Sequence, residues 1–417
     1  MDKLSESLAL FDRQPRDTGL LGREWIEYRP INQLVEESPI EFNIPATSTS
    51  YLDLERLKLH IKLQLRTSDG SPVTADNLVG LVNVPLSSIF SQVEMSLQHQ
   101  AVNHVGTNYA YKAYFDMILN SNVNDQNGKM SAWGFHKDRG PDIDEPDPES
   151  GPNTGLYMRY KETQSGRICD YEGPLFLDLC QQKRLVLNGV PIQIKLWPHK
   201  NAFRLMSPET NPDYKVHIVD AYLKVCTVKP NSGIMLGHNE ALKASPALYP
   251  YMKSTIKTYS LAAGIYSFSA EDLFLGNVPN SLVISCVSSE SFNGSYKKNP
   301  FKMFHYNCNY LNFMVDGQNF PSRPLVPNYA AGNFVEAYQT LYSNTTSALH
   351  ISRGDYTHGY CMYVIDFQDG DDTSILKKGQ TRVEMKFATP LPEPITVIMY
   401  ARFSSLLEIS QSRAVTI

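Results

Sequence analysis

The spacing of the ten histidines is the first place to look for chemistry. A metal site on a cupin-type β-sandwich needs an HxH pair followed by a carboxylate, because alternate residues of a strand point the same way. No two histidines here have that spacing. His99 and His104 lie five apart, which is a poor spacing for ligands on one strand face, so we interpret them as turn or edge residues. The pattern predicts no metal ligand.

Carboxylates, hydroxyls and thiols form no catalytic pattern either. The chain has no GxSxG elbow, no Walker phosphate loop and no GxGxxG turn. Asp178 and Asp366 are the third residues of two similar strings, FLDL and VIDF, but equivalent positions in two copies of a domain would place them far apart. The six cysteines form no CxxC pair, and we interpret them as buried, reduced thiols. We predict no catalytic residue, no cofactor and no enzymatic activity.

One acidic cluster lies in residues 122–155, a polar stretch with four prolines. Its members are Asp142, Asp144, Glu145, Asp147 and Glu149. They lack the alternating Asp/Asn-with-Gly pattern of a calcium loop. We therefore expect a solvated loop.

Composition excludes several classes of function. The formal net charge of −5 and the pI near 6.1 argue against a nucleic-acid binder, which needs a basic face. No apolar run approaches the roughly 18 to 20 residues of a membrane span, and the N-terminal stretch lacks the apolar core of a signal peptide. A chain of 417 residues with 42% hydrophobic residues is long enough for two globular cores.

The elements that would position these side chains are mainly strands. Residues 57–65, LKLHIKLQL, alternate apolar and polar residues without a break, which predicts a strand with one buried face. Further segments with this period are residues 93–97, 175–179, 216–225, 282–287, 311–315, 363–367 and 382–387. Only two short stretches, residues 109–119 and 333–342, favour helices.

The chain contains an ordered internal repeat. VEMSLQHQAV matches LNFMVDGQNF, and the helical AYKAYFDMILNS then matches NFVEAYQTLYSN. FLDL next matches VIDF, and VPIQIKLW, with Pro191, matches EPITVIMY, with Pro394. The changing offset places an insertion of about 36 residues in the first copy, within residues 122–155. Four matches in order predict a duplicated antiparallel sandwich.

Several longer strings resemble a known family when they are taken together in their order. They are WIEYRP, PLSSIFSQVEMSL, YAYKAYFDMIL, DLFLGNVP, FNGSYKKNPF, VDGQNFPSRPL and LLEISQSRAV. Together they resemble the major capsid protein of Polinton (Maverick) elements and of the related adintoviruses. The resemblance runs from about Leu10 to the C-terminus, and residues 122–155 match least.

The resemblance implies an all-β double jelly roll, in which two eight-stranded antiparallel sandwiches stand side by side with short helices in their loops. It divides the chain into an N-terminal arm (1–20), a first jelly roll (21–228, with the inserted loop 122–155) and a second jelly roll (229–417). It further implies a hexon-like homotrimer of pseudo-hexameric outline that tiles an icosahedral shell. The insert would then lie on the virion exterior or at the trimer crown.

The implied partners are other copies of the chain and a minor or penton capsid protein, with no sequence-specific nucleic acid. The N-terminal LSESLALF is expected to form a short amphipathic arm that contacts a neighbour, a minor protein or a membrane. The implied location is the capsid shell of the virion, assembled inside the host cell. Two alternatives stay open, namely a minor or vertex capsid protein and a two-domain carbohydrate-binding β-sandwich.

Overall fold

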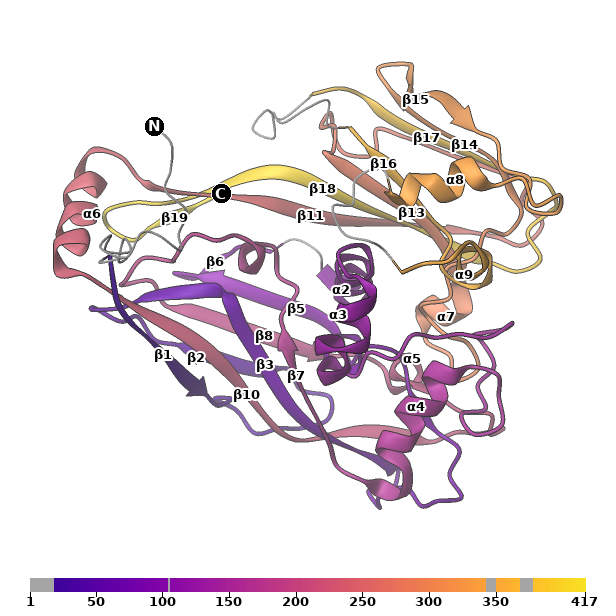
Figure 1. Ribbon diagram of the computed structural model, residues 1–417, viewed down its shortest axis with the longest axis horizontal. Coiled ribbons are helices and arrows are strands. Elements are labelled where there is room, and N and C mark those ends of the chain that lie inside the picture. Colours follow the sequence, from indigo (N-terminus) through magenta and orange to yellow (C-terminus); the bar gives the residue numbers. More distant parts are fainter. Residues whose placement is uncertain (1–18, 104–105, 343–349, 368–377) are drawn as a thin grey trace, which may run out of the picture.

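A computed structural model describes residues 19–103, 106–342, 350–367 and 378–417, and it consists mainly of antiparallel strands (Figure 1). The predicted all-β class is confirmed. Of the predicted N-terminal arm, only Gly19 and Leu20 fall within the described residues, and Leu20 already begins the first strand. His104 lies outside the described residues, whereas His99 has a positive φ of 68° in the turn between two strands, as expected.

The first sandwich pairs two four-stranded sheets, with the orders β1-β10-β3-β7 and β2-β8-β5-β6. The strands of the first sheet are β1 (Leu20–Tyr28), β10 (Tyr214–Pro230), β3 (Tyr51–Thr67) and β7 (Cys169–Pro174). Those of the second are β2 (Ile40–Ile44), β8 (Ile192–Pro198), β5 (Phe90–Leu97) and β6 (Gln100–Ala101). The alternation predicted for residues 57–65 is confirmed in β3, whose five inward side chains from Leu57 to Leu65 are at most 1% exposed.

The second sandwich repeats this order of strands. Its sheets are β11-β18-β13-β16, with β19 added beside β18, and β12-β17-β14-β15. The strands of the first sheet are β11 (Ala247–Leu261), β18 (Ile395–Ile409), β13 (Ser281–Ser288), β16 (Met362–Asp366) and β19 (Val415–Thr416). Those of the second are β12 (Ser267–Glu271), β17 (Thr381–Phe387), β14 (Cys308–Val315) and β15 (Gln318–Leu325). A short pair, β4 (Gly80–Leu81) with β9 (Leu205–Met206), forms a separate two-stranded sheet.

The two sandwiches allow the sequence repeat to be checked strand by strand. The match of β5 with β14 is confirmed, because each is the fourth strand of its copy and lies between the seventh and fifth strands. The match of VPIQIKLW with EPITVIMY is wrong: β8 lies between β2 and β5, so its counterpart is β17, and the counterpart of β18 is β10. Apolar alternation is common to all these strands, so local similarity cannot tell which neighbours each strand pairs with.

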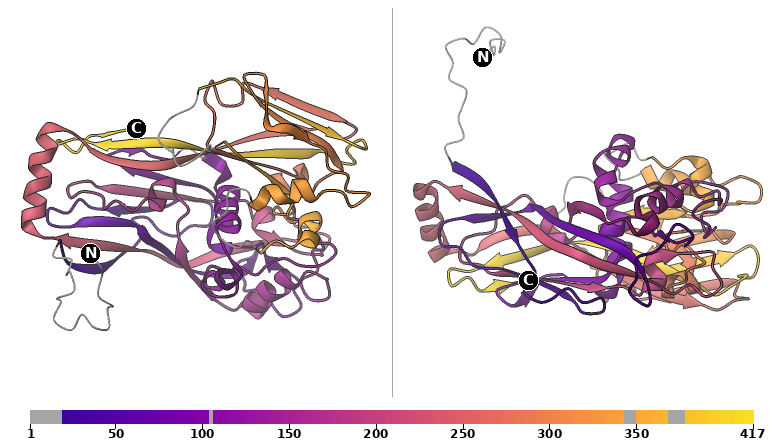
Figure 2. Two further views of the ribbon diagram at one scale, coloured as in Figure 1. Left: turned by 45° about the horizontal axis from the view of Figure 1, so that its top comes forward. Right: turned by 90° about the horizontal axis from the view of Figure 1, so that it is seen from below.

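Helices occupy the loops and the link between the sandwiches (Figure 2). They are α1 (Pro85–Ser88), α2 (Tyr109–Leu119), α3 (Val123–Asn127), α4 (Thr154–Thr163), α5 (Asn201–Arg204), α6 (Ser232–Ala244), α7 (Ser289–Asn293), α8 (Val335–Gln339) and α9 (Arg353–His358). Short 3₁₀ turns are η2 (Gly106–Asn108), η3 (Lys129–Trp133), η4 (Gln164–Gly166), η5 (Asp178–Gln181) and η6 (Thr340–Tyr342). The helix predicted at 109–119 is confirmed, and that at 333–342 is α8 continued by η6.

Three element predictions were wrong or incomplete. Residues 175–179 form no strand, because the chain leaves β7 at Pro174 and then makes the 3₁₀ turn η5. The sequence reading missed α4 and α6, although an asparagine N-cap begins each: the side chain of Asn153 accepts from two backbone amides and that of Asn231 from one. Neither helix has a wide apolar face, so the pattern of hydrophobic residues did not reveal it.

Candidate functional site at the junction of the two sandwiches

Helix α2 lies at the junction between the sandwiches and is buried on every side. All of its residues from Tyr109 to Ile118 are buried, including one lysine and one aspartate. Tyr109 and Ala113 pack in the core of the first sandwich, whereas the remaining apolar side chains belong to the cluster that fills the second. A helix that is apolar all round needs protein on all sides. We infer that α2 is the central wedge that joins the two cores.

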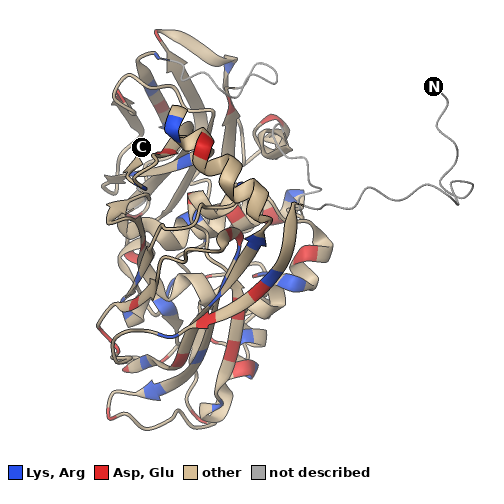
Figure 3. Ribbon diagram, turned by 90° about the vertical axis from the view of Figure 1, so that its left-hand side faces the viewer, with Lys and Arg blue, Asp and Glu red and all other residues tan. Residues whose placement is uncertain are grey.

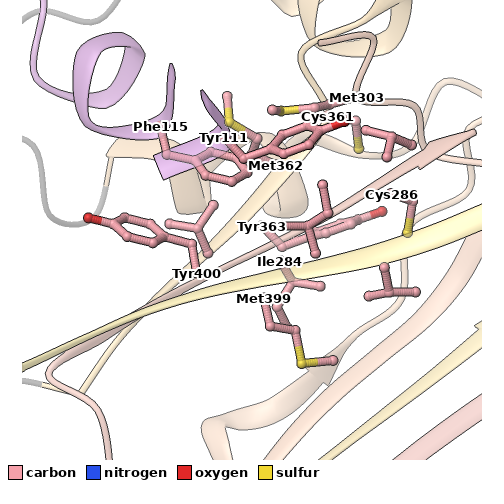
Figure 4. Close-up of a cluster of buried hydrophobic side chains, with 14 of the residues drawn as sticks. Tyr111, Phe115, Ile284, Cys286, Met303, Cys361, Met362, Tyr363, Met399 and Tyr400 are labelled. Atoms are coloured by element: carbon pink, nitrogen blue, oxygen red, sulfur yellow. The ribbon is translucent and has the colours of Figure 1, made fainter. Parts of the chain in front are cut away.

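Aromatic rings make the contact between α2 and the second sandwich. Tyr114 stacks on Phe301 with ring centroids 4.2 Å apart and an angle of 2°. Phe115 stacks on Tyr400 of β18 at 5.6 Å. Figure 4 shows part of this contact, in which the rings of Tyr111 and Phe115 from α2 lie against apolar and sulfur-containing side chains of the second sandwich. Close packing of large rings fixes the angle between the sandwiches, because a core of this density does not deform gradually.

A buried charge network crosses the same junction. Lys112 Nζ lies 2.6 Å from Asp116 Oδ2, one turn further along α2, and 2.9 Å from Asp178 Oδ1 in η5. The three side chains are only 1 to 3% exposed. On the far side, the hydroxyl of Tyr400 donates to Asp116, and the backbone amide of Ser254 in β11 donates to Asp178 at 2.7 Å. The network therefore ties α2 and η5 to two strands of the second sandwich.

The charges in this network stabilise one another against the cost of burial. Burial by itself would lower the pKa of Lys112, but the carboxylates of Asp116 and Asp178 outweigh it and hold that pKa above its ordinary value. Burial would likewise raise the pKa of Asp116, and the positive charges of Lys112 and Arg402 hold it below its ordinary value. Burial raises the pKa of the Tyr400 hydroxyl, and the Asp116 carboxylate raises it further. The ionised lysine and carboxylate and the neutral phenol are thus the stable forms.

The insert of the first copy makes a second set of contacts across the junction. Forty-nine residues separate α2 from β7, whereas nineteen separate η6 from β16, so the first copy has 30 extra residues here. Lys302 Nζ, from the second sandwich, lies 2.8 Å from Asp142 Oδ1 and 2.9 Å from Asp144 Oδ2. The side chain of Ile143 is 2% exposed and packs against Gly359. Asp142 is 57% exposed, as a solvated loop predicts, but Asp144 is 23% exposed and Ile143 is buried, so partners more than 150 positions away order this part of the loop.

Asp138, within the insert, connects both halves of the molecule. Its Oδ1 lies 2.7 Å from Arg159 Nη2 of α4, and both side chains are at most 1% exposed. Its Oδ2 accepts from the side-chain amide of Asn299 at 3.1 Å, and its backbone carbonyl accepts from the hydroxyl of Tyr360 at 2.9 Å. Nearby, Lys137 Nζ lies 2.8 Å from Asp355 Oδ2 of α9. The insert therefore works as a clamp between the sandwiches.

The predicted site residues have structural positions. Asp178 belongs to the junction network, whereas Asp366 ends β16, so the two are not equivalent as the FLDL/VIDF match had implied. All six cysteines are buried and free. Among the described residues, no group of three or more His, Cys, Asp or Glu side chains could hold a metal ion. Within those same ranges, no helix is long and apolar enough to cross a membrane.

Four residues of the junction were not predicted from the sequence: Lys112, Asp116, Asp138 and Arg159. One local signal was available for the first two, because a lysine and an aspartate four positions apart interrupt the otherwise apolar string YAYKAYFDMIL. A charged pair in a helix with no polar face indicates buried partners elsewhere. No pattern in the neighbouring sequence indicates that Asp138 or Arg159 is buried or paired.

Comparisons with known proteins agree with the double jelly-roll architecture. A chain in the cryo-EM structure of the Sputnik virophage matches with a TM-score of 0.67 at 12% identity, covering 100% of this chain and 93% of that one. The Faustovirus major capsid protein matches with a TM-score of 0.58 at 8% identity, covering 96% and 92%. The mavirus major capsid protein matches with a TM-score of 0.54 at 11% identity, covering 100% and 95%. These similarities show that the fold is a double jelly roll.

One curated relative is also similar in sequence. The uncharacterized protein F54H12.2 of Caenorhabditis elegans is 25% identical over 420 residues, covering 95% of this chain and 97% of that protein. No protein-family model matches the chain.

Proposed function

We propose that this chain is a major capsid subunit, in which three copies form a pseudo-hexameric capsomer of an icosahedral shell. The observation that carries the proposal is the repeated strand order, β1-β10-β3-β7 with β2-β8-β5-β6 and then β11-β18-β13-β16 with β12-β17-β14-β15. Two similar sandwiches in one chain give a cyclic trimer six similar corners, so the trimer packs in a hexagonal array. The solved proteins with this fold include the major capsid proteins of Faustovirus and mavirus.

The junction supports this role because a capsomer needs a fixed angle between its two sandwiches. The buried aromatic layer, the Lys112 network and the clamp made by the insert all act on that angle. Nothing in this arrangement requires catalysis, and the role is structural. In this proposal the first jelly roll spans 21–228 and the second spans 229–417, with α6 as the link, and the insert 122–155 lies at the outer crown of the trimer.

The proposed partners follow from the role. The chain binds copies of itself and then a minor or penton capsid protein that closes the shell at its vertices. Its location is the capsid of a virion that assembles inside the host cell.

The decisive experiment is the mass of the purified chain by light scattering after size exclusion, with electron microscopy of the same peak. A trimer near three times the 47.0 kDa chain mass, with a hexagonal outline in projection, is the expected result. A chain that stays monomeric at micromolar concentration, and forms no particles at any salt concentration or pH tried, would overturn the proposal. It would favour the carbohydrate-binding alternative, which a glycan array tests directly.

A further inference from the structure

A cavity of about 670 Å³ lies beneath α6, at the end of the molecule where β19 and the first described residues also lie (Figure 1). Its apolar lining comes from both sandwiches and the link: Leu185, Leu187, Ile234, Leu242, Pro246 and Leu248. Its polar side chains have partners already, since the Tyr51 hydroxyl lies 2.9 Å from Nδ1 of His238 and the Tyr249 hydroxyl donates to the carbonyl of Leu185 at 3.2 Å. The cavity thus offers mainly apolar surface.

Helix α6, the wall of this cavity, is itself poorly covered. It has 13 residues, and Leu242 is its one buried residue. Leu236 is 67% exposed and Ile234 is 37% exposed, and Leu248 beside the helix is 44% exposed. Figure 3 shows this helix from outside, with few charged residues along it. An isolated helix of this length is marginal in water, and the exposed apolar residues on and beside α6 leave room for a further packing partner.

The part of the chain outside the structure begins at this cavity. Gly19 lines the cavity, and its carbonyl accepts from the backbone amide of Asn231, the N-cap of α6, at 2.9 Å. Eighteen residues precede it, and they include LSESLALF at positions 4–11. In that string Leu4, Leu8 and Phe11 recur at the i, i+4, i+7 spacing of one helical face.

We propose that residues 4–11 of each chain dock in the cavity beneath α6 of the same chain. The seven residues 12–18 reach at most about 25 Å when extended, which is enough to turn back from Gly19. So short a tether gives the chain's own segment a high effective concentration at the cavity. Glu6 is the one charged residue among positions 4–11, and it would meet no carboxylate in the lining, which contains Arg184. Docking would cover Ile234 and Leu248, the two large exposed apolar residues that line the cavity.

Crosslinking tests the proposal on the full-length protein. Leu8→Cys with Ala241→Cys, on the cavity face of α6, provides the reporter pair for a short bismaleimide. All six native thiols are buried and burial raises their pKa values, so the introduced cysteines react selectively. The control pair is Leu8→Cys with Val335→Cys, which is 46% exposed on α8 at the opposite end of the molecule (Figure 1).

The expected product is an intrachain crosslink at the mass of one chain, formed by the reporter pair and absent from the control pair. A product of two-chain mass would overturn the proposal, because the occupant would then be the segment of a second copy. Equal crosslinking of both pairs, or none, would overturn it as well. A second measurement removes residues 1–11 and follows hydrogen exchange: the amides of α6 should exchange several-fold faster while those of α2 stay unchanged. Both readouts work on a monomer or a trimer, so failure here is distinct from failure of the proposed capsomer.

Discussion

Replacing Lys112 by Met is expected to destabilise the junction strongly. The substitution keeps much of the side-chain volume but leaves Asp116 and Asp178 buried, at most 3% exposed, without the cation that lies 2.6 and 2.9 Å from them. Removing one partner of a buried ion pair costs about 3 to 5 kcal/mol. With an unfolding entropy of about 2.1 cal/mol/K per residue, this corresponds to a Tm lowered by roughly 3 to 6 °C if both sandwiches unfold together.

The chain offers a matched control for this experiment. Lys129 pairs with Asp125 four positions earlier at 2.8 Å, yet its side chain is 63% exposed. An exposed pair contributes about 0 to 1 kcal/mol, so Lys129→Met should lower Tm by about 1 °C or less. Scanning calorimetry of both variants compares the same chemical change at two depths. If Lys112→Met melts no lower than Lys129→Met, the junction network is not desolvated and the reasoning fails.

The double change Lys112→Met with Asp116→Asn removes one of the buried, unpaired charges and should recover part of the Tm lost by Lys112→Met.

The sign of the pH dependence of folding stability follows from the two shifted pKa values of the junction. Because the folded pKa of Asp116 is depressed, its contribution is present above the unfolded value near 3.9 and is lost as pH falls through the folded pKa. Because the pKa of Lys112 is raised, its contribution persists until pH rises through the unfolded value near 10.4 toward the folded one.

Three further predictions concern the clamp and His199, whose ring stacks on that of Phe203 with centroids 3.7 Å apart. Gly359→Ala should cost about 1 to 3 kcal/mol in thermal unfolding, because its φ is +151° and a Cβ would lie 2.3 Å from Cδ1 of Ile143. Gly332→Ala, with φ +72° and open space, is its control, and equal costs would contradict the packing argument. Lys302→Ala should speed proteolysis between residues 139 and 152 several-fold. Lys161→Ala is the control and should not change cleavage, because Lys161 forms an exposed pair with Glu149 at 3.7 Å. If cleavage of the Lys302→Ala variant is unchanged, Lys302 does not hold the insert. Burial, followed by Arg204 and Lys200, lowers the pKa of His199 to about 3, so its contribution is lost as pH falls from about 6.5 toward that value. His199→Gln should therefore reduce the drop in Tm between pH 7 and pH 5, and an unchanged drop would exclude this histidine as a source of acid sensitivity.

The sequence predicted those features that depend on neighbouring residues. The alternation of residues 57–65 identifies β3 and its buried face, since side-chain period reports local backbone conformation. The bounds of α2 were predicted to the residue, because turn residues flank its apolar string. The pairing of strands could not be predicted in this way, because VPIQIKLW and EPITVIMY are similar in sequence although β8 and β18 occupy different places in their sheets.

The sequence by itself therefore determined most of the strands that alternate in polarity, the helix α2, the twofold repetition of the sandwich and the absence of recognisable catalytic motifs. Only the tertiary structure decided which strands pair with one another and which charged side chains are buried from solvent. Asp142 and Asp144 form ion pairs with Lys302 because the fold places that lysine beside them. Likewise, Lys112 is an interior cation because α2 is enclosed by two cores. Periodicity is a property of consecutive residues, whereas burial and ion pairing depend on contacts between residues far apart in the chain.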